Sequence, residues 1–344
     1  MDDIYFLGID IGGANLKIVG LNKNKKISFV SEEKCEIWKG LSDFDKKILK
    51  LNEIISNKTV IGVTMTAEMC DNFKKRKKGV KKIIKHIRKG LDRNVYFWEN
   101  VKKKFFSVKP SYDNVASMNW LATGKFVAKK ISNAIVIDLG STSTDLIFIK
   151  KTKIVNKGFS DLKRLHFSEL LYTGFTRTPL FGITNKFRFN KKNYFVLPEN
   201  FANIADVYRI LKKTSSKIDL FDTMDRRSKS LLNSYRRVAR NFGFDYTNKK
   251  KELISDLCKE IVKIQVSKIT NSVKQNLVRY KMSKKEVSLV TCGIGKDFLY
   301  KQFVQRDYKV LKFEDIVAGK SNLRKKAAFH APATSCAFLV SSIK

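Results

Sequence analysis

The chain has few of the residues that build metal centres and disulfide frameworks. Among its 344 residues are five cysteines and three histidines. The cysteines are far apart and form no CxxC pair, so we expect neither a disulfide framework nor a structural zinc site. His166 and His330 have no neighbour in sequence that could activate them, and we interpret both as packing or surface residues.

Long apolar runs are also absent. No uninterrupted apolar stretch approaches the roughly 18 residues that a membrane span needs. The sequence starts with Met1-Asp2-Asp3 and runs directly into a strand-like segment, which does not resemble a signal peptide. These features predict a cytoplasmic protein with no membrane partner. The length predicts two domains, and the sequence does not define an oligomeric state.

Acidic residues are scarce relative to basic ones. The chain has 32 Asp plus Glu against 70 Lys plus Arg, a net charge of +38. The densest basic run, residues 74–89, keeps its apolar residues at helical spacing, which predicts an amphipathic helix with a solvated basic face. No recognisable nucleic-acid-binding motif accompanies it, so no specific nucleic-acid partner is expected. We expect the charge to help draw in small anionic substrates; a polyanion-binding protein is the alternative outside enzymes.

The sequence contains an internal repeat. Residues 6–21 and 134–149 superimpose with a shift that places Asp10 on Asp138 and Gly12 on Gly140. Each copy consists of a strand ending in Asp-x-Gly, a turn of small residues and a second apolar strand. A polar reversal and a third strand follow in both copies, from Ile27 and from Ile154.

The turns of this repeat have the composition of phosphate-binding loops. Glycine permits a positive φ and a close backbone approach, so that consecutive N–H groups converge on phosphate oxygens. The candidate phosphate-binding residues are Gly12, Gly13, Asn15, Lys17, Gly140, Ser141, Thr142 and Thr144. Asp10 and Asp138 are suited to hold Mg²⁺ or its waters, because this ion prefers carboxylate oxygens. The alternative is a pair of ordinary glycine-containing hairpins.

A third glycine element occurs at residues 287–296. An apolar run that predicts a buried strand precedes Gly293 and Gly295, and a helix opens after them. Such a turn can pack against a nucleotide base or another ligand, and it is equally consistent with a tight connection between a strand and a helix.

Two Asp-Gly hairpins in duplicated halves, followed by a late glycine turn, resemble the actin, sugar-kinase and heat-shock chaperone superfamily. This resemblance implies an α/β fold of two actin-like (ribonuclease H-like) domains with the ligand cleft between them. It also implies Mg²⁺ as a cofactor and leaves ATP binding open. The boundaries expected are 1–130 for the first half, closed by a helix at 331–344, and 131–330 for the second, with a substrate segment inserted at 160–245.

Further segments resemble one branch of that superfamily. They are VTMTAEMCD (63–71), ASMNWLAT (116–123), LYTGFTRTP (171–179), DVYRIL (206–211), TMDRRSKS (223–230), RVAR (237–240) and HAPATSCA (330–337). Together they are similar to the hydantoinase/oxoprolinase-related group of tetrahydromethanopterin-linked one-carbon transfer pathway proteins. Where that group would have Asp-Gly-Arg, this chain has Asp225-Arg226-Arg227.

The resemblance implies a transferase of methanofuran biosynthesis. The reaction would join an aminomethylfuran-methanol diphosphate to the phenol of γ-glutamyltyramine and release diphosphate. An ATP-dependent hydantoinase- or oxoprolinase-like hydrolase and a small-molecule kinase are the alternatives. Asp10 and Asp138 would hold the metal, and Glu68 or Asp145 would accept the phenol proton.

The remaining candidates for substrate binding lie outside the repeat. Glu68 and Asp71 follow a predicted strand at 59–66, although acids are also common in the first turn of a helix. Arg177 is suited to bind a carboxylate or a diphosphate, and a surface arginine is the alternative. The other candidates are Tyr172, Thr173, Gly174, Asp206, Asp225 and Arg227, and surface ion pairs are equally consistent with the last three.

Overall fold

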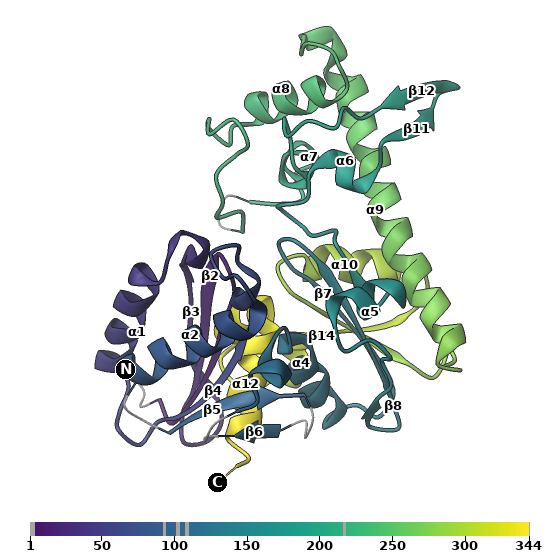
Figure 1. Ribbon diagram of the computed structural model, residues 1–344. Coiled ribbons are helices and arrows are strands. Elements are labelled where there is room, and N and C mark those ends of the chain that lie inside the picture. The colour runs from purple at the N-terminus through teal and green to yellow at the C-terminus, as the bar shows by residue number, and fades with distance from the viewer. Residues whose placement is uncertain (1–3, 92–93, 101–103, 107–109, 216–217, 344) are drawn as a thin grey trace.

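The computed structural model describes residues 4–91, 94–100, 104–106, 110–215 and 218–343, the segment 104–106 by its backbone alone. Two mixed sheets lie side by side, and a third, smaller part of the chain extends above them in Figure 1. Each sheet has helices packed against its faces, so that separate hydrophobic cores form on either side of the first sheet and along the second.

The first sheet has the strand order β3-β2-β1-β4-β5-β6. The strand β1 is antiparallel to β2 and parallel to β4. Its strands are β1 (Phe6–Ile11), β2 (Asn15–Leu21), β3 (Ile27–Lys34), β4 (Val60–Met65), β5 (Val95–Glu99) and β6 (Lys104–Phe106). On one face lie α1 (Ser42–Ile54) and α2 (Arg76–Gly90), the latter being the predicted amphipathic helix.

The second sheet repeats this arrangement in the order β10-β8-β7-β13-β14, with β9 paired to β8. The strand β7 is antiparallel to β8 and parallel to β13, as β1 is to β2 and β4. Its strands are β7 (Ala134–Leu139), β8 (Thr144–Lys150), β9 (Lys153–Ile154), β10 (Leu170–Leu171), β13 (Ser288–Cys292) and β14 (Lys309–Lys312). The duplicated actin-like α/β fold is thus confirmed.

The part above the sheets in Figure 1 follows the second hairpin in sequence. It contains α6 (Leu180–Ile183), β11 (Lys186–Phe189), β12 (Lys192–Phe195), α7 (Ile204–Ile210) and α8 (Leu231–Asn241). The 29-residue helix α9 (Lys251–Arg279) begins there and continues down beside the second sheet. Its apolar residues, including Leu257, Ile261 and Val273, are buried as their helical spacing predicts.

The remaining elements are short helices that connect these parts. They are α3 (Tyr112–Val115), α4 (Asn119–Ala128), α5 (Asp161–His166), α10 (Lys296–Val304), α11 (Ser321–Ala327), α12 (Ala331–Val340) and the 3-10 helices η1 (Ile37–Lys39), η2 (Ala67–Met69), η3 (Asn248–Lys250), η4 (Phe313–Ile316) and η5 (Ala328–His330). Among the described helices, none combines the length and the hydropathy that crossing a membrane would require.

The helix α12 packs directly onto β1 of the first sheet, where Figure 1 shows it in yellow among the early strands. Pro332 lies in its first turn, as its fixed φ favours. Gly8 of β1 lets the two backbones meet, because a Cβ at this position would lie 1.9 Å from the carbonyl oxygen of Ala333. No side-chain rearrangement can relieve this contact, since the atom it meets belongs to the backbone.

We therefore expect Gly8→Ala to destabilise the protein by about 3 kcal/mol or more, since overpacking against a rigid backbone forces the helix away from the sheet. Gly182→Ala in α6 is the matched control, because its nearest contact would be an ordinary 3.5 Å. Chemical denaturation of both variants measures the difference. Equal stability of the two variants would contradict the close approach of α12.

Candidate functional site

The two hairpin turns of the repeat face one cavity of about 310 Å³. Asp10 and Asp138, at the carboxyl ends of β1 and β7, both line it, in agreement with the usual position of ligands in open α/β sheets. Of the other predicted residues, the cavity wall includes Gly12, Gly13, Asn15, Lys17, Gly140, Ser141, Thr142, Asp145, Tyr172 and Arg177.

A lysine surrounded by carboxylates occupies the first half of the cavity. Lys17 lies opposite Asp10 in the β1–β2 register, with 3.8 Å between its Nζ and Asp10 Oδ2. Burial alone would lower the pKa of Lys17, but the nearby carboxylates, first that of Asp10, raise it. Asp10 is only 2% exposed, and its Oδ1 has no hydrogen-bond partner among the described residues. Burial raises the pKa of Asp10 against the opposing charge of Lys17.

The second half of the cavity has a different partner at the equivalent position. Asp138 lies opposite Asp145, where the first copy has Lys17. Burial, and then the charge of Asp145, raise the pKa of Asp138 to about 7. Asp145 is itself paired with the buried Arg164, with 2.6 Å between Oδ1 and Nη1. The arrangement favours a cation beside Asp138, because a positive charge there would stabilise its ionised form.

The turns themselves have the same backbone in both copies. Gly12 N donates to Asn15 O and Gly140 N donates to Ser143 O, both at 3.0 Å. None of Gly12, Gly13 and Gly140 has a positive φ. Gly13 packs closely on a side chain, since a Cβ there would lie 2.8 Å from Cys70 Sγ.

Thr144, Thr173 and Gly174 support the second turn from behind and do not line the cavity. The buried Thr144 donates through Oγ1 to the carbonyl oxygen of Thr173, at 2.6 Å. Gly174 packs so closely on the turn that a Cβ would lie 2.3 Å from Ser141 O. Arg177 N donates to the same oxygen at 2.8 Å. This packing of residues 173–177 on the turn fixes the position of Arg177 in the cavity wall.

Glu68 lies behind the cavity wall rather than in it. Its side chain is 1% exposed and accepts a 2.7 Å hydrogen bond from Ser117 Oγ, whose residue does line the cavity. Burial raises the pKa of Glu68 to about 7, although the bond from Ser117 opposes this. Asp71 is exposed and is not part of the cavity wall.

The late glycine turn is packed against the end of β7. Gly293 has a φ of +80, and a Cβ there would lie 2.3 Å from Asp138 Oδ1. At Gly295 a Cβ would lie 2.3 Å from Leu139 Cδ2. Neither glycine lines the cavity, whereas Ile294 between them does. This geometry supports the tight connection between strand and helix, one of the two interpretations of this turn.

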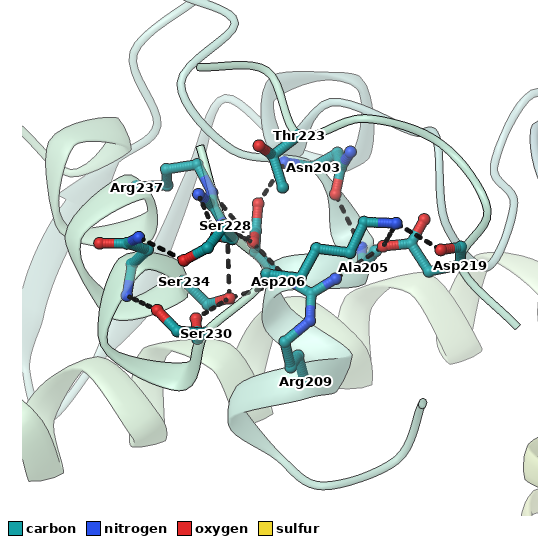
Figure 2. A network of polar contacts seen from close by, with 12 residues as sticks. Asn203, Ala205, Asp206, Arg209, Asp219, Thr223, Ser228, Ser230, Ser234 and Arg237 are labelled. Atoms are coloured by element: carbon teal, nitrogen blue, oxygen red, sulfur yellow. Dashed lines mark hydrogen bonds and ion pairs between the residues drawn. The ribbon is translucent and has the colours of Figure 1, made fainter. Parts of the chain in front are cut away.

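Asp206 belongs to the polar network in Figure 2, and Asp225 and Arg227 are connected to it through Arg237 and Thr223; none of the three lines the cavity. Asp206 is fully buried and pairs with both Arg209 and Arg237, each at 2.7 Å. Arg237 also pairs with Asp225 at 3.0 Å, and Asp225 accepts a bond from the backbone N–H of Arg227. For Asp206 and Asp225 the structure therefore favours the ion-pair interpretation, with Asp206 in the interior rather than at the surface.

The described residues contain no group of three or more His, Cys, Asp or Glu side chains arranged to hold a metal ion on their own. A magnesium site here would therefore need oxygens from a bound phosphate and from water, which is the usual mode of this ion. The unpaired Oδ1 of the buried Asp10 fits such a role.

Comparison with known proteins identifies the family. The family model described as Hydantoinase/oxoprolinase matches residues 59–318. The chain belongs to the hydantoinase/oxoprolinase family. One relative of the chain is a protein from Methanocaldococcus jannaschii, which is named (4-{4-[2-(gamma-L-glutamylamino)ethyl]phenoxymethyl}furan-2-yl)methanamine synthase. It is 32% identical over 301 residues, which cover 86% of this chain and 88% of the relative.

Two further comparisons agree. A protein of the same name from Methanococcus vannielii is 30% identical over 217 residues, covering 63% of this chain and 95% of the relative. The nucleotide-free structure of an acetone carboxylase has a TM-score of 0.58 at 10% identity, covering 98% of this chain and 70% of that one. At this level of identity the second comparison shows the fold alone.

Several cavity residues of this hydantoinase/oxoprolinase-family chain were not predicted. They are Glu32, Ser117, Asn119, Asp161, Arg164, Phe221 and Phe329. Glu32 could have been found, because it lies opposite Lys17 in the β2–β3 register.

His330 is buried beside Glu32, with 3.9 Å between its Nε2 and Glu32 Oε2. Burial, and then the charge of Lys17, lower the pKa of His330 to about 3. It packs as a neutral residue, as expected.

Arg226, which replaces the glycine expected for this group, adopts a left-handed conformation with φ +54. Glycine adopts this conformation without the strain that a side chain brings. We expect Arg226→Gly to stabilise the protein by about 1 kcal/mol relative to Arg226→Ala, which keeps the strain. Denaturant unfolding of the two variants measures this difference, and equal stabilities would show that the turn is unstrained.

The raised pKa of Glu68 predicts how the stability of the protein depends on pH. Because its folded-state pKa of about 7 lies above the ordinary 4.5, the folded protein binds more protons than the unfolded chain between these values. The contribution of Glu68 to stability therefore falls as pH rises from 4.5 to 7. Glu68→Gln keeps the acceptor for Ser117 and removes the titration, so its stability relative to the original protein should rise by up to about 3 kcal/mol across this range. Unfolding midpoints measured at pH 5 and pH 8 test it; a constant difference would contradict the raised pKa.

Proposed function

We propose that this protein is a transferase that joins an aminomethylfuran-methanol diphosphate to the phenol oxygen of γ-glutamyltyramine and releases diphosphate, in methanofuran biosynthesis. The observation that carries the proposal is the similarity to two synthases whose name describes the product of such a condensation. In that product a phenoxymethyl group links the furan to the γ-glutamylaminoethyl benzene ring.

The cavity has the groups that a diphosphate leaving group requires. The C–O bond to the furan-methyl carbon breaks while negative charge grows on the diphosphate. Lys17 and the polar turns around Gly12 and Gly140 lie in the wall where this charge can be neutralised. Asp10 and Asp138 would hold Mg²⁺, which would supply further charge neutralisation when bound. The furan ring can stabilise positive charge on its methyl carbon, so cleavage can run ahead of attack.

The phenol proton needs an acceptor, and the site has two candidates. Asp145 lines the cavity, but its Oδ1 is already paired with Arg164 Nη1 at 2.6 Å. Glu68 has a pKa near neutrality and is connected to the cavity through the hydroxyl of Ser117. We therefore assign proton transfer to Glu68 through Ser117: the phenol gives its proton to Ser117 Oγ as Ser117 passes its own to Glu68.

The family match favours a second function, because it describes hydantoinases and oxoprolinases. An ATP-dependent hydrolase of this kind, or a kinase, would produce ADP from a lactam or hydroxyl substrate. Release of diphosphate from the furan substrate without ATP distinguishes the transferase from both.

We expect Asp10→Asn and Asp138→Asn each to lower the rate of diphosphate release by about 100-fold or more, since both remove charge from the metal-binding wall. Asp71→Asn is the matched control, because the same change at an exposed position outside the cavity should leave turnover unchanged. Full turnover in folded Asp10→Asn and Asp138→Asn proteins would refute the proposed mechanism.

A further inference from the structure

One side of the cavity is apolar and comes from the part above the sheets. Ile218, Leu220 and Phe221 line the cavity there. Leu220 is 41% exposed although it is a large apolar side chain. An apolar wall of this kind is not needed for a diphosphate, and it predicts contact with an uncharged part of a substrate.

Arg177 lies on this apolar side. Its guanidinium is stacked over the ring of Phe221, with 4.7 Å between Cζ and the ring centroid. Within the described residues no carboxylate forms an ion pair with it, and burial without an opposing charge lowers its pKa. This cation–π contact holds the guanidinium beside the ring, and a guanidinium can bind a carboxylate in bidentate fashion. The guanidinium of Arg177 can therefore bind an anionic group of a substrate.

The loop that carries Phe221 is held at both ends by the network in Figure 2. Before Phe221, Asp219 pairs with Arg209 at 2.6 Å and with Lys229 at 3.7 Å. After it, Thr223 Oγ1 donates to the carbonyl oxygen of Arg227 at 2.7 Å. The ion pairs of Asp206 and Asp225 therefore help to position the loop through which Phe221 lines the cavity. A wall fixed in advance lowers the entropy cost of binding.

We propose that Arg177 and Phe221 form the acceptor subsite, in which Arg177 binds the α-carboxylate of γ-glutamyltyramine. This rests on the proposed function. Phe221 and Leu220 contact the methylene groups of the glutamyl chain, and the phenol extends from there towards the two turns. A diphosphate is the less suitable occupant of this subsite, because it has no apolar part for Leu220 and Phe221 to contact, whereas Lys17 and the polar turns suit its charge.

A truncated substrate tests the assignment. Tyramine has the phenol but lacks the glutamyl carboxylate, so the original protein should use γ-glutamyltyramine with a KM on the order of 100-fold lower. Arg177→Met should remove most of this preference and leave the KM of the furan diphosphate unchanged, and Arg177→Lys should retain part of it. Arg188→Met is the control, because this exposed arginine of β11 lies outside the cavity. If Arg177→Met instead raises the KM of the diphosphate and keeps the preference, the subsite is refuted.

Binding measured without turnover separates this proposal from the proposed function. Calorimetry with inorganic diphosphate present should show γ-glutamyltyramine binding at least 10-fold more tightly than tyramine, and Arg177→Met should abolish the difference. This result supports the subsite even if no condensation is detected. Equal binding of the two amines by the original protein refutes the subsite even if condensation proceeds.

Discussion

The site depends on the balance between buried acids and the few cations that accompany them. Five acidic residues line the cavity, and three basic ones line it with them: the acids are Asp10, Glu32, Asp138, Asp145 and Asp161, and the bases are Lys17, Arg164 and Arg177. Placing so many carboxylates in a partly desolvated space is costly unless positive charge is present. The cavity therefore has an excess of negative charge inside a strongly basic protein. Burial raises the pKa values of Asp10 and Asp138, and a divalent cation beside them would stabilise their ionised forms.

The repeat shows how far sequence reasoning extends. The strand-turn-strand pattern predicted both hairpins and the third strands, because these depend on local periodicity. The fold implied by the resemblance predicted that Asp10 and Asp138 line one cleft. Lys17 and Asp145 occupy equivalent positions, and their opposite charges distinguish the two halves chemically. This difference can be read from the sequence once the pairing register of the two hairpins is known.

Other parts of the site depend on contacts that no local pattern records. Arg164 reaches Asp145 from α5, and Phe221 reaches the cavity from the loop between α7 and α8. Asp206 resembled a ligand-binding acid because its motif did, yet its burial among arginines makes it a support for that loop. Glu68 was expected to face the cleft, whereas the structure places it behind the cavity wall, with Ser117 between it and the cavity. Tertiary packing decides each of these roles.

The contact between Gly8 and α12 has a consequence for how the protein is made. The first sheet cannot cover this face of β1 until α12, encoded far downstream, has left the ribosome. Until then the strands that present Asp10 and Lys17 have an unfinished core. The second sheet is also incomplete until β13 pairs with β7. Both halves of the cavity thus depend on segments that are synthesised late, so the complete cavity forms only after the chain has returned to both sheets.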